Sequence, residues 1–304
     1  MAVLPQRGMC ARVSVARWIS GGIEACRNGQ PSYCRCMGLE VCVAGATGWT
    51  GRAVAQVILE VDDLTLCSVV SRSASGQDLG QAWGGERIDV PVFERVSDAL
   101  DGVQVLVDYT SHHAVRGNTL AAVDLGVAVV IGSSGLSATD FTDIDEAARS
   151  AGVGVVAAGN FSLTAAMAQA AALLVARHLP NREIIDYASA AKPDAPSGTA
   201  RELAERLATV NTTSTQVPVD QTSGQREARG TTVAGTQIHS LRLPSFVVST
   251  EVVFALPDER LSIRHDAGST PTPYVAGTLL AIRAATGRIG LVRGLDTLLL
   301  DPKQ

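Results

Sequence analysis

VCVAGATGWTGRAV, residues 41–54, carries three glycines between a short apolar run and a segment with helical periodicity. Gly45, Gly48 and Gly51 permit a tight turn and a close backbone approach, so that a pyrophosphate can lie on the helix N terminus. Because the stretch joins the first strand to the first helix, it predicts a dinucleotide-binding βαβ unit rather than a merely structural glycine turn. The same loop supplies three further candidate cofactor contacts, Thr47, Trp49 and Thr50.

Strands and helices alternate downstream of this loop. Apolar runs of strand length occupy residues 39–44, 64–70, 104–108, 127–131 and 153–157. Helical segments separate them, at residues 52–60, 114–125 and 139–151. This alternation predicts an α/β fold with a Rossmann-type, doubly wound parallel sheet.

The pattern changes after residue 160. An Ala-rich helix (164–178), a strand (184–188) and a second helix (197–208) lead to three segments that alternate apolar and polar residues, at 237–243, 246–254 and 260–265, before a final helix at 275–286. The alternating segments favour a second α+β domain with a mixed or antiparallel sheet. We therefore assign residues 38–161 plus 269–304 to a dinucleotide-binding domain and residues 162–268 to a substrate-binding domain.

The composition argues against several classes of protein. The chain has 304 residues, 46% hydrophobic and 18% charged, and its net charge of −5 argues against a nucleic-acid partner. No apolar run reaches the roughly 18–20 residues that span a bilayer, so we expect no membrane association and a cytoplasmic location. Cys34 and Cys36 have the wrong spacing for a zinc site and no His lies nearby, so no metal is expected.

Residues 1–36 differ from the rest, because they contain five arginines and a single acidic residue, Glu24. A sorting peptide is one interpretation, since organellar presequences are rich in Arg and poor in acids. We favour the alternative that the functional chain begins at Met37, because a strand starts directly after it. Residues 1–36 are then expected to be a poorly ordered tail.

The end of the second predicted strand bears on the choice of cofactor. Ser71, Arg72 and Ser73 stand where an acid would accept hydrogen bonds from the ribose of NAD. A guanidinium beside two hydroxyls suits a 2′-phosphate instead, so NADP(H) is the preferred cofactor and NAD(H) the alternative. Later strand ends add candidate contacts, because ligands of such sheets bind beyond the carboxyl ends of the strands. These candidates are Tyr109, Thr110, Gly132, Ser134, Asn160 and Phe161.

A second candidate site lies in YASAAKPDAPSGTA, residues 187–200. Its last residues are typical of a helix start, where small side chains leave the backbone N–H groups free for an anion. Lys192 stands just upstream and is one of only two lysines among 25 Lys and Arg side chains. A compact ammonium beside an open helix N terminus predicts a seat for a carboxylate or phosphate. The candidate ligands at the helix start are Ser197, Gly198 and Thr199.

These motifs, in this order, resemble the dihydrodipicolinate reductase family of lysine biosynthesis. The resemblance runs from about Met37 to the last helix and rests on three motifs: Lys192-x-Asp194-Ala195-Pro196-Ser197-Gly198-Thr199-Ala200, Asn160-Phe161-Ser162 and Ile238-His239-Ser240-x-Arg242. It implies a Rossmann domain completed by the C-terminal helix, and a central domain that binds substrate and builds a homotetramer. It also implies that Lys192, Gly198, Thr199 and Ser134 hold the substrate carboxylate, with Phe161 near the nicotinamide.

The sequence departs from this family at the position of the proton donor. The family's usual run is Glu-x-His-His-x-x-Lys, whereas residues 186–192 read DYASAAK. Ala188 stands at the position of the proposed acid, and Ser189 at that of its neighbour, a substrate ligand. Because loss of a positioned acid costs about 10²–10⁴-fold where a proton is transferred, we predict a divergent member that lacks the catalytic histidine pair.

Two other side chains are candidates for the missing donor. Lys192 is the catalytic candidate, either as the acid or only as the carboxylate anchor. Tyr187 is another donor, unless it faces the opposite way from Ala188 along the strand. Asp194 is interpreted as a cap of the following helix rather than as a chemical group.

Three functions are compatible with these residues. The first is an NADP(H)-preferring reductase of a small carboxylate-bearing imine or unsaturated acid other than the usual family substrate, because a substrate already charged as an iminium needs no strong acid. The second is the ordinary 4-hydroxy-tetrahydrodipicolinate reductase of lysine biosynthesis, with Lys192 or water in place of His. The third is a catalytically silent sensor of NADP or a metabolite, against which the retained carboxylate site argues.

Overall fold

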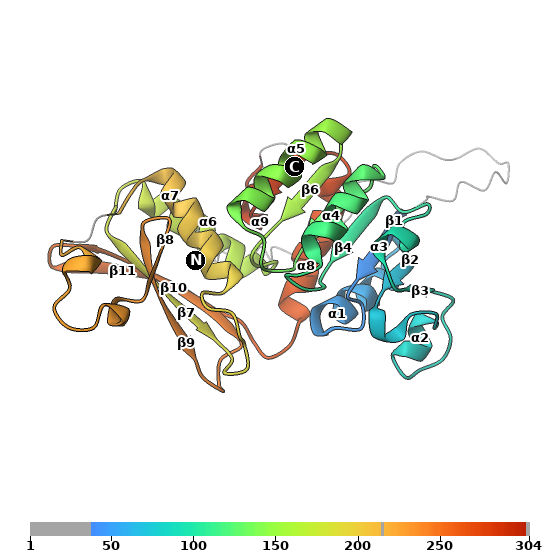
Figure 1. Ribbon diagram of the computed structural model, residues 1–304, viewed down its shortest axis with the longest axis horizontal. Coiled ribbons are helices and arrows are strands. Elements are labelled where there is room, and N and C mark those ends of the chain that lie inside the picture. Colours follow the sequence, from blue (N-terminus) through green and yellow to red (C-terminus); the bar gives the residue numbers. More distant parts are fainter. Residues whose placement is uncertain (1–37, 214–215, 302–304) are drawn as a thin grey trace, which may run out of the picture. The chain divides into compact units, whose positions relative to one another are not determined.

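The computed structural model describes residues 38–213 and 216–301, so the predicted N-terminal tail lies outside the described residues. The first part of the chain, together with a strand near its end, forms a seven-stranded sheet whose strand order is β12-β6-β5-β4-β1-β2-β3, and every pairing in it is parallel (Figure 1). Its strands are β1 (Leu39–Ala44), β2 (Leu64–Val70), β3 (Val92–Phe93), β4 (Val105–Asp108), β5 (Ala128–Ile131), β6 (Gly154–Ala157) and β12 (Gly290–Arg293). The predicted doubly wound parallel sheet is confirmed.

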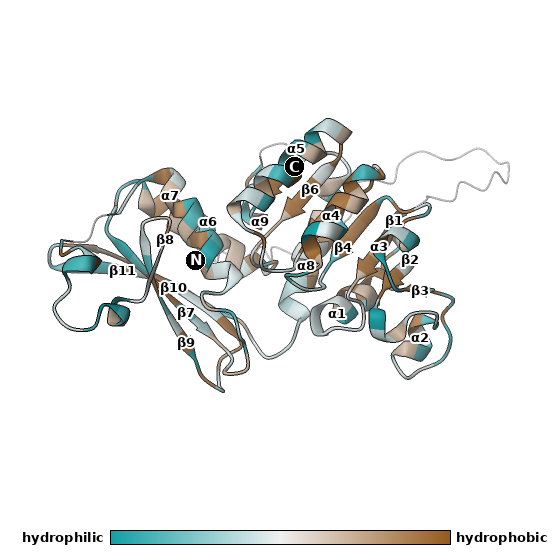
Figure 2. Ribbon diagram, viewed as in Figure 1, coloured by the Kyte–Doolittle hydropathy of each residue, from teal (hydrophilic) through white to brown (hydrophobic). Residues whose placement is uncertain are grey.

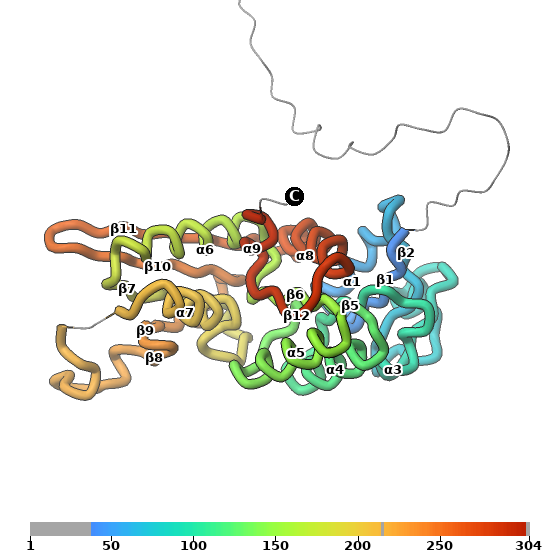
Figure 3. The backbone as a smooth tube through the Cα atoms, turned by 90° about the horizontal axis from the view of Figure 1, so that it is seen from above, coloured from blue at the N-terminus to red at the C-terminus, as the bar shows by residue number. Residues whose placement is uncertain are grey.

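Helices cover both faces of this sheet. Figure 3 shows α1 and α8 on one side of it and α3, α4 and α5 on the other. The helices of this half are α1 (Trp49–Ile58), α2 (Leu79–Ala82), α3 (Val96–Ala99), α4 (Val115–Asp124), α5 (Ala138–Ala151), α8 (Thr272–Ala285) and α9 (Leu295–Leu299). Residues 41–44 in β1 and the whole of β4 are buried, and the strands form the apolar centre in Figure 2. Strands covered on both faces read as continuous apolar runs, which explains why they are visible in the sequence.

The chain order of the strands creates the place where a ligand binds. From β1 the chain moves outward to β2 and β3, and then returns to β4 on the other side of β1. Ala44 at the end of β1 pairs with Asp108 at the end of β4. The loops that follow these two strands diverge at this point, which is the crevice where open α/β sheets bind their ligands.

A second sheet has five strands in the order β11-β10-β7-β9-β8. They are β7 (Arg182–Ala188), β8 (Thr231–Val233), β9 (Thr236–Arg242), β10 (Val248–Leu256) and β11 (Glu259–Asp266). β7 and β9 are parallel and the other pairs are antiparallel, so the predicted mixed sheet is confirmed. α6 (Leu163–Ala176) and α7 (Gly198–Val210) pack on one face of this sheet around Ile184, Leu207 and Phe254.

Some elements differ from the prediction. β12 and α9 follow the helix that was expected to close the chain, and four- and five-residue elements carry too little periodicity to be seen in a sequence. α1 begins at Trp49 rather than at Arg52, so that Gly51 lies inside its first turn. β12 joins the first sheet beside β6, as the assignment of residues 269–304 requires, while the domain division itself stays a prediction. Among the described residues, no helix is both long and apolar enough to cross a membrane.

Candidate active site

The glycine loop after β1 accepts only glycine at two positions. Gly45 has a φ of +87°, and a Cβ there would lie 2.4 Å from the carbonyl oxygen of Tyr109. A Cβ on Gly51 would lie 2.2 Å from the carbonyl oxygen of Gly45. Gly48 is the N-cap of α1 and offers no side chain to the N–H groups of the first turn. The loop therefore fits the pyrophosphate of a dinucleotide, which requires bare backbone and free amides.

A cavity of about 740 Å³ opens beside this loop. It is lined by seven of the predicted cofactor residues, namely Gly45, Thr47, Gly48, Ser71, Arg72, Tyr109 and Thr110. The hydroxyls of Thr47 and Ser71 lie 2.8 Å apart, which joins the glycine loop to the end of β2. The lining also includes residues that were not predicted, among them Arg95, His113 and Asn118. Arg95 follows β3, and a strand of two residues leaves no signal by which the sequence could have placed it.

A smaller cavity of about 200 Å³ lies next to it, and Tyr109 lines both. Its lining brings together residues from both sheets: Trp49, Thr50, Gly132, Ser134, Asn160, Phe161, Lys192, Ser197, Gly198 and Thr199 from the prediction, with Gly159, Val248 and Tyr274 besides. Aromatic rings form much of this wall, since Tyr109 meets Phe161 edge-on at 6.2 Å and Trp49 meets Tyr274 at 5.8 Å. The cavity thus combines an aromatic, apolar wall with a cationic, hydrogen-bonding end.

Asp108 holds the two strand-end loops that form the crevice. Its fully buried carboxylate accepts hydrogen bonds from the N–H and hydroxyl of Thr110, at 2.9 and 2.7 Å, and from the Ser133 hydroxyl at 2.7 Å. Asn118 in α4 donates to its second oxygen at 2.8 Å. Asp108 is therefore a structural hub of the site. In the sequence, this role is indicated by an acid at the last position of an otherwise apolar strand.

The start of α7 is the candidate anion seat. Ser197 is the N-cap and accepts a hydrogen bond from the N–H of Ala200 at 3.3 Å. The predicted role of Asp194 as the helix cap is wrong, because its carboxylate lies 2.8 Å from the ammonium of Lys192 instead. Asp194 stands three residues before the N-cap, too early to reach the free N–H groups of the first turn. It orients Lys192 toward the cavity that both the lysine and the helix start line.

A buried ion pair fixes the loop that leads into α7. Asp186 is fully buried and accepts hydrogen bonds from Arg242 at 2.9 Å, from the Ser240 hydroxyl at 3.0 Å and from the N–H of Ser197 at 2.8 Å. Arg242 also donates to the carbonyl oxygen of Asp194 at 2.6 Å. Burial alone would raise the pKa of Asp186, but the hydrogen bonds from Ser197 and Arg242 outweigh it and lower the pKa.

Tyr187, the other proton-donor candidate besides Lys192, and Ser189, the predicted substrate ligand, both lie outside the lining of the smaller cavity. Tyr187 faces the side of the sheet opposite to Ala188, where its hydroxyl donates to Glu251 at 3.0 Å and the Arg264 guanidinium lies over its ring. Ser189 lines neither cavity, and its hydroxyl accepts from the N–H of Ala191 at 3.3 Å, so its substrate role stays a prediction. Ala188 is fully buried. Among the described residues that line the smaller cavity, none is a histidine.

Comparisons with known proteins agree with this architecture. The family description "Dihydrodipicolinate reductase, N-terminus" matches residues 39–161, and "Dihydrodipicolinate reductase, C-terminus" matches residues 160–299. The 4-hydroxy-tetrahydrodipicolinate reductase of Thermosynechococcus vestitus is 34% identical over 273 residues, covering 88% of this chain and 99% of the relative. The enzyme of the same name from Moorella thermoacetica is 36% identical over 264 residues, covering 86% and 98%.

Solved structures show the same fold. Dipicolinate-bound dihydrodipicolinate reductase from Paenisporosarcina sp. TG-14 is 26% identical with a TM-score of 0.67, covering 86% of this chain and 99% of that one. GenD2 from gentamicin A biosynthesis, in complex with NAD, is 16% identical with a TM-score of 0.57, and this likeness concerns the fold alone. The chain therefore belongs to the dihydrodipicolinate reductase family and is an NAD(P)H-dependent oxidoreductase.

Proposed function

We propose that this reductase acts on a small carboxylate-bearing imine or unsaturated acid other than 4-hydroxy-tetrahydrodipicolinate. One observation carries the proposal. The smaller cavity has a cation and an open helix N terminus for a carboxylate, but among its described lining residues it has no histidine. The position at which the family resemblance implies an acid is instead the buried methyl group of Ala188.

The residues divide into two groups by their chemistry. Lys192, Ser134 and the N–H groups of Gly198 and Thr199 hold the carboxylate, since a cation and a helix N terminus both favour negative charge. The apolar wall that includes Phe161 suits the nicotinamide ring, and a bound nicotinamide supplies the hydride. An iminium substrate already carries its proton, so that it accepts a hydride without a general acid. On this proposal Lys192 is an anchor, and its pairing with Asp194 fixes the direction of its ammonium.

The second candidate function is the lysine-pathway reductase with Lys192 or a water molecule as the proton donor. It is favoured by relatives of that name that are 34–36% identical over nearly their entire length. The two functions differ in what histidine at residues 188 and 189 would do. Under the lysine-pathway reading the chain has compensated for the missing histidines, and restoring them changes the rate little.

A rate comparison separates these functions. NADPH oxidation is measured with freshly generated 4-hydroxy-tetrahydrodipicolinate and with a panel of cyclic imines and unsaturated acids that carry a carboxylate. We expect turnover with a panel compound, negligible turnover with 4-hydroxy-tetrahydrodipicolinate, and a gain of about 10- to 100-fold on the latter when Ala188→His and Ser189→His are combined. Rapid turnover of 4-hydroxy-tetrahydrodipicolinate by the unaltered protein establishes the lysine-pathway function instead. Tight NADPH binding without any turnover establishes the sensor.

We also propose a preference for NADP(H), because Arg72 and Ser71 line the larger cavity and no acid follows β2. Arg72→Ala is expected to raise KM for NADPH about 10- to 100-fold while leaving KM for NADH unchanged, since only NADPH carries the 2′-phosphate. Arg87→Ala is the control, because Arg87 is exposed, pairs with Asp89 and lines neither cavity. Equal effects of Arg72→Ala on both nucleotides contradict the preference.

We further propose that the chain is a homotetramer whose subunits meet through the face of the five-stranded sheet opposite to α6 and α7. A groove of about 1140 Å³ lies there, lined by apolar side chains such as Ile185, Leu241 and Val253. Leu241 is 37% exposed, and a second copy would bury it. Light scattering is expected to give the mass of four chains, and Leu241→Arg a smaller assembly. A monomeric mass for the unaltered protein contradicts the proposed tetramer. The cytoplasmic location expected from the sequence stays a prediction.

A further inference from the structure

Glu202 in α7 is a buried carboxylate that the reaction itself does not use. It is 7% exposed, and it lies one turn beyond the anion seat on the same helix. One of its oxygens accepts a hydrogen bond from the N–H of Gly159, and the other accepts from the side-chain amide of Gln169 at 3.1 Å. Gly159 belongs to the segment that leaves β6, so this contact joins α7 to the seven-stranded sheet.

Side chains of α7 bind both backbone polar groups of Gly159, its N–H and its carbonyl oxygen. While Glu202 accepts from its N–H, the Thr199 hydroxyl donates to its carbonyl oxygen at 2.8 Å. A Cβ on Gly159 would lie 2.8 Å from the Glu202 carboxylate and 2.9 Å from the carbonyl oxygen of Gly198, so only glycine fits this close approach. The next two residues, Asn160 and Phe161, line the smaller cavity together with the first turn of α7. The double contact thus fixes one wall of the cavity relative to the anion seat.

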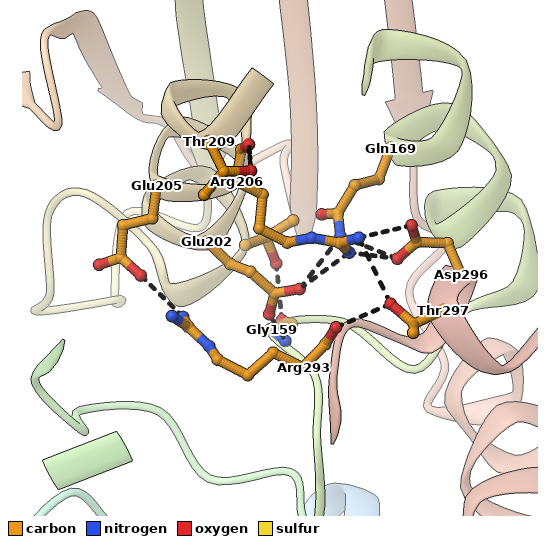
Figure 4. A network of polar contacts seen from close by, with 10 residues as sticks. Gly159, Gln169, Glu202, Glu205, Arg206, Thr209, Arg293, Asp296 and Thr297 are labelled. Atoms are coloured by element: carbon orange, nitrogen blue, oxygen red, sulfur yellow. Dashed lines mark hydrogen bonds and ion pairs between the residues drawn. The ribbon is translucent and has the colours of Figure 1, made fainter. Parts of the chain in front are cut away.

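Further contacts hold α7 against the seven-stranded sheet and its helices (Figure 4). Arg206, one turn after Glu202, donates to both oxygens of Asp296 in α9, and Gln169 bridges Glu202 and Asp296 with its amide nitrogen. Arg293 in β12 donates to Glu205 at 2.7 Å. Because α7 is fixed at several points along one face, a movement of the helix away from Gly159 would break several of these contacts.

The surroundings of Glu202 raise the pKa of its carboxyl group above the ordinary value. Burial is the largest cause of the rise, and the hydrogen bonds from Gln169 and Gly159 and the charge of Arg206 offset only part of it. The groups hydrogen-bonded to its two oxygens, Gly159 and Gln169, are both donors, and the Arg206 guanidinium lies 3.8 Å away. A carboxylate that accepts two hydrogen bonds is held in one orientation, which is the property that a positioning group requires.

We propose that Glu202 is a positioning residue that holds the Gly159–Phe161 wall of the nicotinamide pocket at a fixed place relative to the carboxylate seat of α7. It acts through Gly159 and touches neither substrate nor cofactor. This inference rests on the proposed function of the same cavity as a reductase site. A displacement of about 1 Å between reacting groups costs up to about 100-fold in rate, so that loss of this contact lowers turnover more than binding.

The test compares Glu202→Ala, Glu202→Gln and Glu205→Gln in the full chain. Glu205 is the matched control, because it lies on the same helix and pairs with Arg293 but does not contact Gly159. We expect Glu202→Ala to lower kcat about 10- to 100-fold with the substrate KM and the Kd of NADPH each within about threefold. Glu202→Gln restores most of kcat, because its amide oxygen accepts from Gly159. Glu205→Gln leaves kcat within about threefold.

A second readout does not depend on turnover. Hydrogen–deuterium exchange of the segment 158–161 is measured in all four proteins, with and without pyridine-2,6-dicarboxylate as a carboxylate probe. Faster exchange in Glu202→Ala, but not in Glu205→Gln, supports the inference. Unchanged exchange there, or a folded Glu202→Ala protein with full kcat, overturns it.

The two proposals fail in distinguishable ways. If the unaltered protein turns over no substrate, the proposed function fails and the exchange measurement still decides the role of Glu202. If Glu202→Ala does not fold, Glu202→Asp shortens the side chain by one methylene, withdraws the carboxylate from the N–H of Gly159 and is expected to accelerate exchange of the same segment. Unchanged exchange in Glu202→Asp then overturns the inference.

Discussion

Lys192→Met is expected to lower kcat/KM for the carboxylate-bearing substrate about 100- to 1000-fold, because truncating one partner of a desolvated charge pair costs about 3–4 kcal/mol. Lys192 is the cation in the lining of the smaller cavity, and its side chain is 27% exposed. The loss also leaves the carboxylate of Asp194 unpaired beside the substrate, which adds repulsion. The Kd of NADPH, measured by fluorescence, is expected to stay within about threefold, since the larger cavity lies apart from Lys192.

Two variants control this experiment. Arg260→Met removes a cation from an exposed position of β11 and should leave kcat/KM unchanged. Adding Asp194→Asn to Lys192→Met removes the repulsion and should recover about tenfold. A Lys192→Met protein that retains more than a tenth of kcat/KM would show that the carboxylate binds elsewhere, and the assignment of the α7 start as the anion seat would have to be abandoned.

Asp186→Ala is expected to lower the free energy of unfolding by about 3–5 kcal/mol, because it leaves the Arg242 guanidinium, whose side chain is only 16% exposed, without its partner. For a chain of this size the midpoint of thermal unfolding should fall by roughly 10 °C, measured by calorimetry. Asp266→Ala is the matched control. Asp266 pairs with Arg264, both side chains are exposed, and such pairs contribute less than about 1 kcal/mol. Similar losses in the two variants would contradict the structural role of Asp186.

The same carboxylate predicts a dependence of stability on pH. The folded state lowers the pKa of Asp186 below its unfolded value, which is near 3.9. Its contribution is therefore fully present above about pH 5 and is lost as the pH falls through the lowered pKa. Between about pH 5 and the lowered pKa, the free energy of unfolding of the unaltered protein should fall more steeply with acidification than that of Asp186→Ala. Parallel plots of this free energy against pH would exclude Asp186 as the source of the pH dependence.

The sequence predicted the parts of the protein whose signal is local. The glycine loop and the start of α7 are continuous motifs whose small residues have steric or electrostatic reasons, and both line the cavities that the structure shows. Continuous apolar runs likewise predicted the parallel sheet, because burial on both faces leaves an unbroken pattern, and segments that alternate apolar and polar residues predicted the second sheet.

The parts that the sequence did not predict depend on contacts between distant segments. In the sequence, Glu202 resembles an ordinary polar residue of an amphipathic helix, because nothing local indicates its hydrogen bond with Gly159, 43 residues away. Asp186 was noted only as a departure from the family pattern, because its partner Arg242 lies on another strand. Asp194 was given the wrong partner for the opposite reason, since a local capping rule was applied where a nearby ammonium competes for the carboxylate.

The two cavities also differ in the stage of synthesis at which all of their lining residues have been made. All residues that line the larger cavity lie before residue 122, whereas the smaller one needs Tyr274, near the far end of the chain. The hydroxyl of Tyr109 finds its partner Thr278 169 residues later, at 2.7 Å, and β6 gains its neighbour β12 only at residues 290–293. Because a ribosome delivers the N terminus first, a nascent chain presents the adenosine end of the nucleotide site long before the end that holds substrate. A bound nucleotide that contacts both cavities can therefore stabilise the finished protein but not the growing chain.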